Sequence, residues 1–249
     1  MADYSEQVRM LVAGEHGLVV EFGNDISPEI NGLVLQLTRV LKADPVAGVI
    51  EVVPTYRSLT VYFDPLLIAR EALSGRVKEM LREIKPQNNQ TSPARVVRVP
   101  VCYGGVLGPD LEFVARYANL SPREVVALHT GKPYLVYMLG FTPGFPYLGG
   151  MPEQIAVPRQ EKPRARVPAG SVGIGGKQTG IYPIESPGEW WLIGRTPVKA
   201  FDPHRPDPFL VSAGDYLYFY EIGIEEYFDI RGQVSAGRYI PEEERATRY

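Results

Sequence analysis

The sequence contains few of the residues that form disulfides or bind metal ions. Of 249 residues, one is a cysteine, Cys102, and three are histidines. A single cysteine excludes an intrachain disulfide and, with no secretory signal visible, favours a cytoplasmic location. His16, His129 and His204 are scattered along the chain, with neither an HExxH nor a CxxC motif. We therefore expect no metal site.

Long apolar runs and an excess of one charge are also missing. The apolar runs of the sequence are far shorter than a helix that crosses a bilayer requires. The formal net charge is −3, so the field of the whole protein attracts neither nucleic acid nor an anionic membrane, and we expect neither as a partner. A hydrophobic fraction of 45% excludes wholesale disorder.

The first third of the chain alternates strand and helix patterns in the order ββαββα. Ser27 and Pro28 mark the first helix start, as N-cap and first helical residue. Asp64 and the proline after it are expected to cap the second helix, with Leu66 and Leu67 on its buried side. This order predicts an α+β sandwich domain over residues 1–87.

Residues 85–93 carry no apolar side chain other than proline and are predicted to be a linker. Beyond them, residues 139–200 contain 11 glycines and 9 prolines interleaved with aromatic and β-branched residues. This composition favours short strands with tight turns, and we expect residues 225–230 to form one of the last strands. The prediction for residues 88–249 is a small β-barrel with long loops.

The glycine-rich run at residues 170–179 resembles a phosphate-binding loop only superficially. A P-loop needs Ser or Thr directly after Gly-Lys, and Gln178 stands in that place. The glycines either let backbone approach backbone at a barrel turn or contact a ligand. There is no GxSxG motif, so nucleophilic hydrolysis by this chain alone is poorly supported.

The loop at residues 140–150 holds four glycines and two prolines around Phe141, Phe145 and Tyr147. So constrained an aromatic loop either covers a core or lines a pocket. His129 closes a predicted short helix, where it is either a capping side chain or an acid–base group.

Residues 159–177 form a basic stretch that suits an anionic ligand, although a solvated rim explains it equally well. It has a local excess of +4, because five basic side chains face the single acid Glu161: Arg159, Lys162, Arg164, Arg166 and Lys177.

Several of these segments together resemble one family. They are residues 129–131, 136–151, 158–159, 167–183, 191–197 and 201–203. Their motifs are similar to those of the B subunit of 5-oxoprolinase, a family also described as KipI kinase inhibitors and as allophanate hydrolase subunit 1. The resemblance spans essentially the whole chain.

The resemblance implies an α+β N-terminal domain and a cyclophilin-like β-barrel C-terminal domain. It implies an enzyme component that works with the A and C subunits of 5-oxoprolinase and, with ATP as co-substrate, opens 5-oxoproline to L-glutamate. We expect the isolated chain to be inactive. The alternative is a regulator that inhibits a sporulation-type histidine kinase by docking on it.

We expect a pocket lined by residues 140–150 and 167–182, with a small carboxylate as its ligand; the active site lies either in this chain or at its interface with the C subunit. His129 is the catalytic candidate. The candidate substrate-binding residues are Arg166, Lys177, Gln178, Phe145 and Tyr182.

Overall fold

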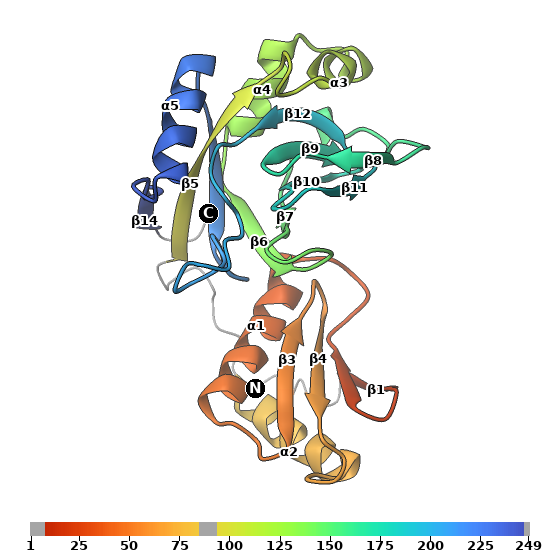
Figure 1. Cartoon of the computed structure of the whole chain (residues 1–249). Coiled ribbons are helices and arrows are strands. Elements are labelled where there is room, and N and C mark those ends of the chain that lie inside the picture. The colour runs from red at the N-terminus through yellow and green to blue at the C-terminus, as the bar shows by residue number, and fades with distance from the viewer. Residues whose placement is uncertain (1–7, 85–93, 247–249) are drawn as a thin grey trace. The chain divides into compact units, whose positions relative to one another are not determined.

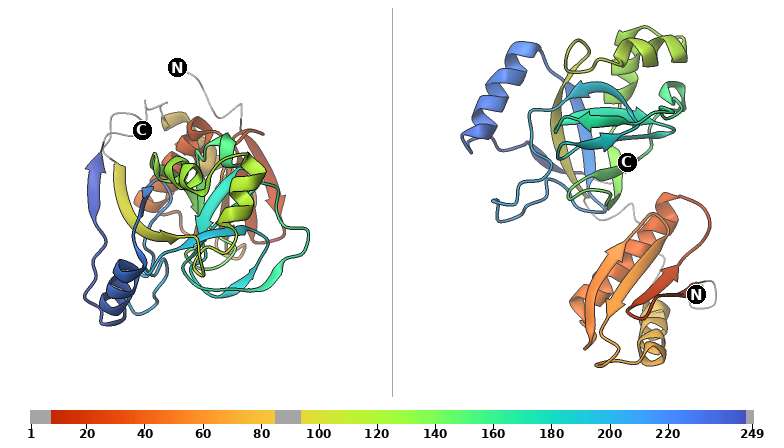
Figure 2. Two further views of the ribbon diagram at one scale, coloured as in Figure 1. Left: turned by 90° about the horizontal axis from the view of Figure 1, so that it is seen from above. Right: turned by 45° about the vertical axis from the view of Figure 1, so that its right-hand side comes forward.

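The computed structural model describes residues 8–84 and 94–246. The chain divides into two compact units, one ending at Ser92 and the other beginning at Pro93 (Figures 1 and 2). The predicted linker, and the predicted boundary between residues 87 and 88, lie outside the described residues. Each unit is therefore treated by itself.

The N-terminal unit has the predicted order of elements around an antiparallel four-stranded sheet, β1-β2-β4-β3. Its elements are β1 (Arg9–Ala13), β2 (Gly17–Glu21), α1 (Pro28–Ala43), β3 (Val49–Pro54), β4 (Ser58–Phe63) and α2 (Arg70–Glu83).

Helix α1 begins where the sequence predicts. The hydroxyl of Ser27 accepts a hydrogen bond from the backbone of Ile30 at 3.2 Å, and Pro28 is the first helical residue. The buried sides of α1 and α2 pack with the inward side chains of the sheet in one hydrophobic core, which includes Leu37, Val61 and Val77. Burial of this shared face holds the unit together.

The expected start of the second helix at Asp64 is wrong. The Asp64 carboxylate accepts a hydrogen bond from the Leu66 backbone at 2.9 Å, which makes a local turn, and α2 begins only at Arg70. Leu66 and Leu67 are consequently 92% and 72% exposed. Asp-Pro begins a turn as readily as a helix, and the turn is what forms here.

The C-terminal unit contains a closed barrel of seven strands. Strand pairing runs β12-β9-β10-β7-β6-β13-β5 and closes from β12 back to β5, while β14 extends β5 outside the ring. The barrel strands are β5 (Ala94–Tyr103), β6 (Tyr134–Leu139), β7 (Pro146–Gly149), β9 (Ser171–Gly175), β10 (Gln178–Ile181), β12 (Trp191–Arg195) and β13 (Tyr216–Glu221). The other elements are α3 (Leu111–Ala118), α4 (Pro122–Thr130), η1 (Glu153–Ile155), β8 (Arg164–Val167), β11 (Ser186–Gly188), α5 (Ile224–Ser235) and β14 (Glu243–Ala246).

A short two-stranded sheet, β8 with β11, forms beside the barrel. It is anchored through Arg164, which donates to the carboxylate of Asp110 at 2.7 Å and to the carbonyl of Trp190 at 3.2 Å. The other oxygen of Asp110 accepts from the backbone of Leu192 in β12 at 2.6 Å. A second small core forms here, separate from the barrel interior, from Phe145, Val167, Tyr182, Trp190 and Leu192.

Residues 225–230 form part of helix α5, so the predicted strand is wrong. Tyr227 and Ile230 are buried three residues apart and pack with Cys102 and Ile222, which is helical spacing. A six-residue window does not separate this spacing from a strand pattern, whereas the twelve residues of α5 do. Figure 1 shows α5 alongside β5.

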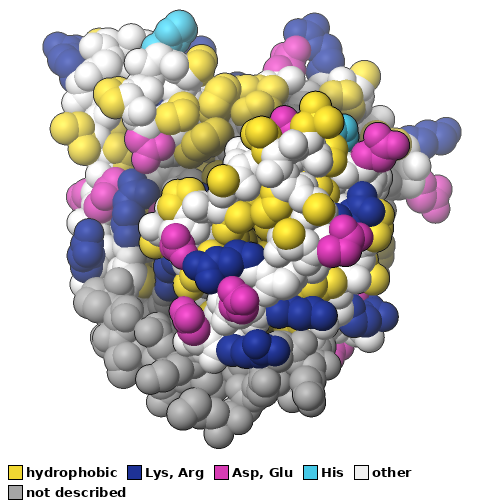
Figure 3. All heavy atoms as spheres, turned by 90° about the horizontal axis from the view of Figure 1, so that it is seen from below, with side chains coloured by type: hydrophobic (Ala, Val, Ile, Leu, Met, Phe, Trp, Pro, Cys, Tyr) yellow, Lys and Arg dark blue, Asp and Glu magenta, His cyan; other side chains and the backbone are white. Residues whose placement is uncertain are grey.

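Among the described residues, no helix combines the length and hydrophobicity that crossing a membrane requires. On the face shown in Figure 3, basic and acidic side chains are interspersed with hydrophobic ones, so neither sign of charge dominates that face.

Candidate functional site

The backbone of the glycine-rich segment packs directly against the ring of Trp190, and we call this glycine surface the floor of the site. In β9 the side chains of Val172 and Ile174 belong to the barrel core, so the alternating residues Gly173 and Gly175 present bare backbone on the outer face. A Cβ added at Gly175 would lie 2.3 Å from Cδ1 of Trp190. Only glycine there allows the indole to lie so close to the strand.

Gly180 of β10 pairs with Gly173 and extends this floor. A Cβ at Gly180 would lie 3.3 Å from Cζ3 of Trp190 and 3.4 Å from Cζ of Phe145. The segment is thus a β-hairpin that seats aromatic rings, with Gly176 in its turn at φ +63°.

Phe145 is the centre of an aromatic cluster built on this floor. Its ring centroid lies 5.4 Å from those of Tyr182 and Trp190, and 5.2 Å from that of Tyr147. Phe141 packs edge-to-face on it at 5.5 Å. The cluster joins rings from three separate segments of the chain and fixes their orientations.

Phe141 is held in a strained conformation at the edge of this cluster. Its φ is +65°, in the left-handed region that a bulky side chain rarely adopts, and the residue is 63% exposed. A hydrogen bond from the Phe145 backbone to the Thr142 carbonyl at 3.0 Å closes the loop around it. Strain of this kind is common at ligand-binding sites.

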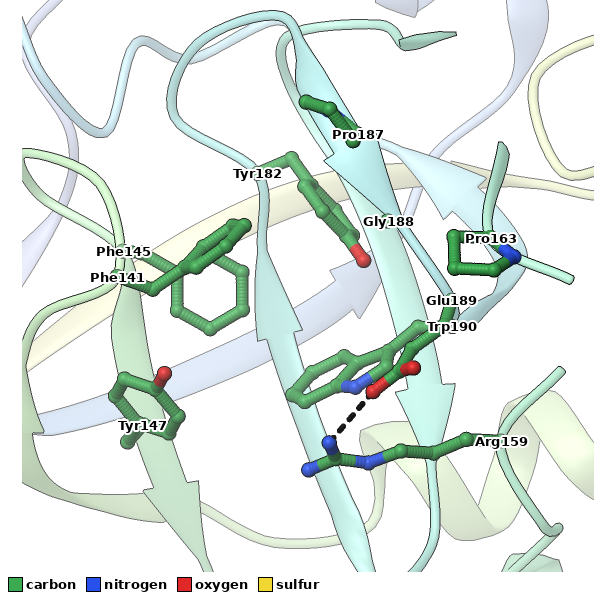
Figure 4. Close-up of a pocket in the computed structure, with 10 residues that line it drawn as sticks. All are labelled: Phe141, Phe145, Tyr147, Arg159, Pro163, Tyr182, Pro187, Gly188, Glu189 and Trp190. Carbon is green, nitrogen blue, oxygen red and sulfur yellow. Dashed lines mark hydrogen bonds and ion pairs between the residues drawn. The ribbon is translucent and has the colours of Figure 1, made fainter. Parts of the chain in front are cut away.

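Arg159 and Glu189 supply the charges of the site. Nη1 of Arg159 donates to Glu189 Oε1 at 2.6 Å, and Nη2 donates to Gln178 Oε1 at 3.1 Å. The guanidinium carbon lies 6.0 Å from the centre of the Trp190 ring. In Figure 4 this ion pair lies on one side of Trp190, with Phe141 and Phe145 on the other.

The hydroxyl of Tyr182 stays protonated at neutral pH. Burial raises the pKa of Tyr182 to about 12, and the backbone of Trp190 hydrogen-bonds the hydroxyl. Gly188 makes room for this group, since a Cβ there would lie 2.4 Å from the hydroxyl oxygen. Tyr182 therefore offers a neutral polar group at the edge of an apolar surface.

These residues enclose a cavity of about 340 Å³, which we call the Trp190 pocket. Its volume is at the small end of the range for ligand pockets, and its walls are aromatic with few polar groups. It suits a small, flat ligand that carries one charged group. The pocket is lined by Phe141, Phe145, Tyr147, Arg159, Pro163, Tyr182, Pro187, Gly188, Glu189 and Trp190 (Figure 4).

The predicted pocket between residues 140–150 and 167–182 is confirmed in part. The first segment supplies Phe141, Phe145 and Tyr147, whereas the second supplies only Tyr182. The remaining lining residues come from residues 159–163 and 187–190, which the prediction did not include.

His129 does not line the pocket but lies inside the barrel unit, with 0% of its surface exposed. Its Nδ1 lies 2.8 Å from the Tyr103 hydroxyl and its Nε2 lies 2.8 Å from the Thr179 hydroxyl. Thr179 gives its one hydroxyl proton to the carbonyl of Gly173 at 3.0 Å, so its oxygen accepts from His129. This pattern puts the ring proton on Nε2 and makes Nδ1 the acceptor for Tyr103.

Burial lowers the pKa of His129 from 6.5 to about 3. The expectation of a side chain that titrates near pH 7 is therefore wrong. The ring stacks on Phe219 with centroids 4.7 Å apart, and the Tyr134 hydroxyl donates to its backbone carbonyl at 2.7 Å. We call Tyr103, His129, Thr179 and the Gly173 carbonyl the His129 network.

The two cations expected in the pocket lie outside it and have acidic partners. Arg166 pairs with Glu185 at 2.8 Å, and its side chain is 78% exposed. Lys177, in the turn of the glycine hairpin, pairs with Glu153 at 2.6 Å. Gln178 does not line the pocket either, but it accepts the hydrogen bond from Arg159 described above.

Sequence reasoning does not single out three residues of the pocket: Arg159, Glu189 and Trp190. Arg159 stands out only as one member of the basic stretch. The glycine spacing is the available signal for Trp190, because glycines alternating along a strand indicate that something large packs closely on the backbone. Nothing local in the sequence distinguishes Arg159 from Arg166.

A family model for the carboxyltransferase domain, subdomain C and D, matches residues 8–211. Fold and sequence thus define a protein of the carboxyltransferase-domain class. The chain is also 44% identical over 224 residues to the B subunit of 5-oxoprolinase from Bacillus subtilis, covering 86% of this chain and 92% of that protein. The chain belongs to the family of 5-oxoprolinase B subunits.

Two solved structures extend the comparison. The structure of TTHA0988 is 40% identical with a TM-score of 0.74, and the match covers 83% of this chain but only 40% of that one. The Kluyveromyces lactis urea amidolyase matches 99% of this chain with a TM-score of 0.82, over 17% of its own length. At 22% identity this second match shows the fold alone.

Proposed function

We propose that this chain is the B subunit of an ATP-dependent 5-oxoprolinase, which opens 5-oxoproline to L-glutamate together with the A and C subunits in the cytoplasm. The observation that carries the proposal is the 44% identity with a 5-oxoprolinase B subunit over most of both chains. We also take the closed barrel to be of the cyclophilin-like kind that the family resemblance implies.

The Trp190 pocket is the proposed binding site for the substrate. 5-Oxoproline is a flat five-membered lactam with one carboxylate, which matches a small aromatic cavity with one cation at its side. Phe145 and Tyr182, both candidates from the sequence, are the proposed ring contacts. Gln178 is proposed to position Arg159 rather than to touch the substrate.

The glycine-rich segment does not fit the phosphates of ATP. A phosphate loop presents its backbone N–H groups at the start of a helix, whereas residues 171–181 form a hairpin of two strands. The lysine of the segment is paired with Glu153. The proposal therefore assigns ATP binding to another subunit, and no step of this chain passes through ATP.

Reconstitution tests the proposal. The full chain, the A and C subunits, and the combination of all three are each assayed for glutamate formation that depends on ATP and 5-oxoproline. We expect turnover only in the combination, and none from the isolated chain. Absence of turnover in the combination, with binding to a histidine kinase instead, would favour the regulatory alternative.

A further inference from the structure

We propose that Glu189 occupies, on Arg159, the place that the carboxylate of the substrate takes, so that a flat cyclic carboxylate binds the Trp190 pocket by displacing the Glu189 side chain. The inference rests on the proposed function for the choice of 5-oxoproline as ligand. The displacement itself follows from the charges and contacts of the pocket.

The charge balance of the pocket points to displacement. Among the pocket-lining residues, Arg159 is the single base and Glu189 the single acid, and they neutralise each other at 2.6 Å. A carboxylate that entered beside this pair would leave two negative groups facing one cation. A carboxylate that replaces Glu189 restores the pair and releases Glu189 to water.

The way Arg159 is held allows such an exchange. Gln178 accepts from Nη2 at 3.1 Å and steadies the guanidinium without neutralising it, whereas Glu189 holds Nη1. Loss of Glu189 from Nη1 therefore leaves the guanidinium oriented. Gln178 thus positions the guanidinium, whereas Glu189 provides the negative charge that a ligand carboxylate can replace.

Glu189 can leave at little cost. Its side chain is 37% exposed and that of Arg159 is 48% exposed, and ion pairs this open to solvent contribute little to stability. The backbone stays in place, because the carbonyl of Glu189 accepts from the Gln160 backbone at 2.8 Å. Only the side chain has to turn away.

The rest of the pocket selects the ring. Trp190 lies between the ion pair and the Phe141–Phe145 side of the cavity (Figure 4). A ring bonded directly to a carboxylate can therefore contact the indole while its charge reaches Arg159. A neutral lactam such as 2-pyrrolidinone keeps the ring contacts and has nothing to exchange with Glu189.

The fluorescence of Trp190 can be used to measure binding in its pocket. The protein has two tryptophans, and Trp191 points to the other side of the strand, where it stacks on Phe113 at 3.7 Å. In the full chain carrying Trp191→Phe, the fluorescence of Trp190 is titrated with 5-oxoproline and with 2-pyrrolidinone at constant ionic strength. Thermal melts of every variant confirm that it is folded.

We expect Glu189→Gln to bind 5-oxoproline about two- to fivefold more tightly, the scale of an exposed ion pair that no longer competes. Arg159→Gln should bind it at least about tenfold more weakly, since a charge-assisted hydrogen bond is lost. Neither change should alter the affinity for 2-pyrrolidinone. The matched control is Glu185→Gln, which removes the acid from the Arg166 pair outside the pocket and should change nothing.

Weaker binding of 5-oxoproline by Glu189→Gln would overturn the inference, because Glu189 would then contact the substrate. Equal effects on both ligands, or no binding of 5-oxoproline to any variant, would also overturn it. If the reconstituted complex turns over 5-oxoproline but Glu189→Gln does not bind it more tightly, the inference is wrong and the proposed function stands. If Glu189→Gln binds it more tightly but the complex shows no turnover, the proposed function is wrong and the displacement stands.

Discussion

Two polar groups of the barrel unit, the His129 network and the Arg159–Glu189 pair, differ in their access to water. The His129 network is sealed: the histidine is fully buried and both ring nitrogens have hydroxyl partners inside the fold. The Arg159–Glu189 pair is half-exposed beside a cavity. The first centre has the residue type usually associated with catalysis, and the second has the access that a ligand needs.

The comparison shows that burial decides what a polar side chain can do. A buried neutral histidine whose two nitrogens are already hydrogen-bonded fixes the positions of the strands around it and has no proton to exchange with a ligand. An exposed ion pair adds little stability and exchanges partners readily. Four experiments test this difference.

His129→Ala should produce the largest effect. The change leaves a cavity and removes a buried partner from Tyr103 and Thr179, and we expect about 3 kcal/mol less free energy of unfolding. Urea denaturation followed by tryptophan fluorescence measures it, because both tryptophans lie in the barrel unit. A loss of turnover in the assembled complex at unchanged stability would instead favour a catalytic His129.

Gly175→Ala should disturb the pocket from beneath. The added Cβ meets the Trp190 ring at 2.3 Å and forces the indole off its floor, and overpacking of this kind costs about 2 kcal/mol. The near-ultraviolet circular dichroism and the fluorescence of Trp190 should both change, and 5-oxoproline binding should weaken. Gly176→Ala is the control for the Trp190 signal: a Cβ at that turn meets nothing within 4 Å, although its φ of +63° makes the alanine cost about 1 kcal/mol of stability. Its Trp190 spectrum should stay unchanged. An unchanged Trp190 spectrum in Gly175→Ala would show that the added methyl group fits without moving the indole, and would contradict the close packing described here.

The pH dependence of stability should reveal the sealed histidine. His129 has a pKa of about 3 in the folded chain against 6.5 when unfolded, so below pH 6.5 the unfolded state binds a proton that the folded state does not. The stabilisation is complete above about pH 6.5 and falls by about 1.4 kcal/mol for each pH unit between about pH 6.5 and pH 3.

The free energy of unfolding between pH 5 and pH 6.5 is compared for the native chain and His129→Gln, which keeps a donor and an acceptor but does not titrate. The native chain should show the steeper slope, by about one proton. Parallel slopes would mean that water reaches His129.

The sequence predicts more of this fold than of its site. Ser27 marks a helix start that the structure confirms, because a cap acts over three residues of chain. The start at Asp64 and the strand at residues 225–230 are wrong, because a turn and a short apolar window each allow two local structures.

The pocket depends on contacts that local pattern does not encode. Arg159 and Arg166 are both exposed arginines of one basic stretch, yet only Arg159 lies beside Trp190, 31 residues further along the chain. The aromatic loop is identifiable because its own composition constrains it, and Phe145 is indeed the centre of the cluster. Arg159 is brought there by contacts between segments far apart in the sequence, such as the bridge between Val157 and Gly176 and the hydrogen bond from the Gln160 backbone to the Glu189 carbonyl at 2.8 Å.

Arg166→Ala should have the smallest effect of all. Arg166 is one of the substrate-binding candidates from the sequence, and if it held the carboxylate of the substrate the change would cost about ten- to a hundredfold in affinity. In the structure Arg166 pairs with Glu185 at 2.8 Å, both side chains are more than half exposed, and neither lines the pocket. We therefore expect less than about 0.5 kcal/mol change in the free energy of unfolding and no change in 5-oxoproline affinity.

The melting temperature of Arg166→Ala and the activity of the complex assembled with it are measured beside those of Arg159→Ala, which should lose affinity for 5-oxoproline but little stability. A tenfold loss of affinity in Arg166→Ala, at an unchanged melting temperature, would move the carboxylate site away from the Trp190 pocket.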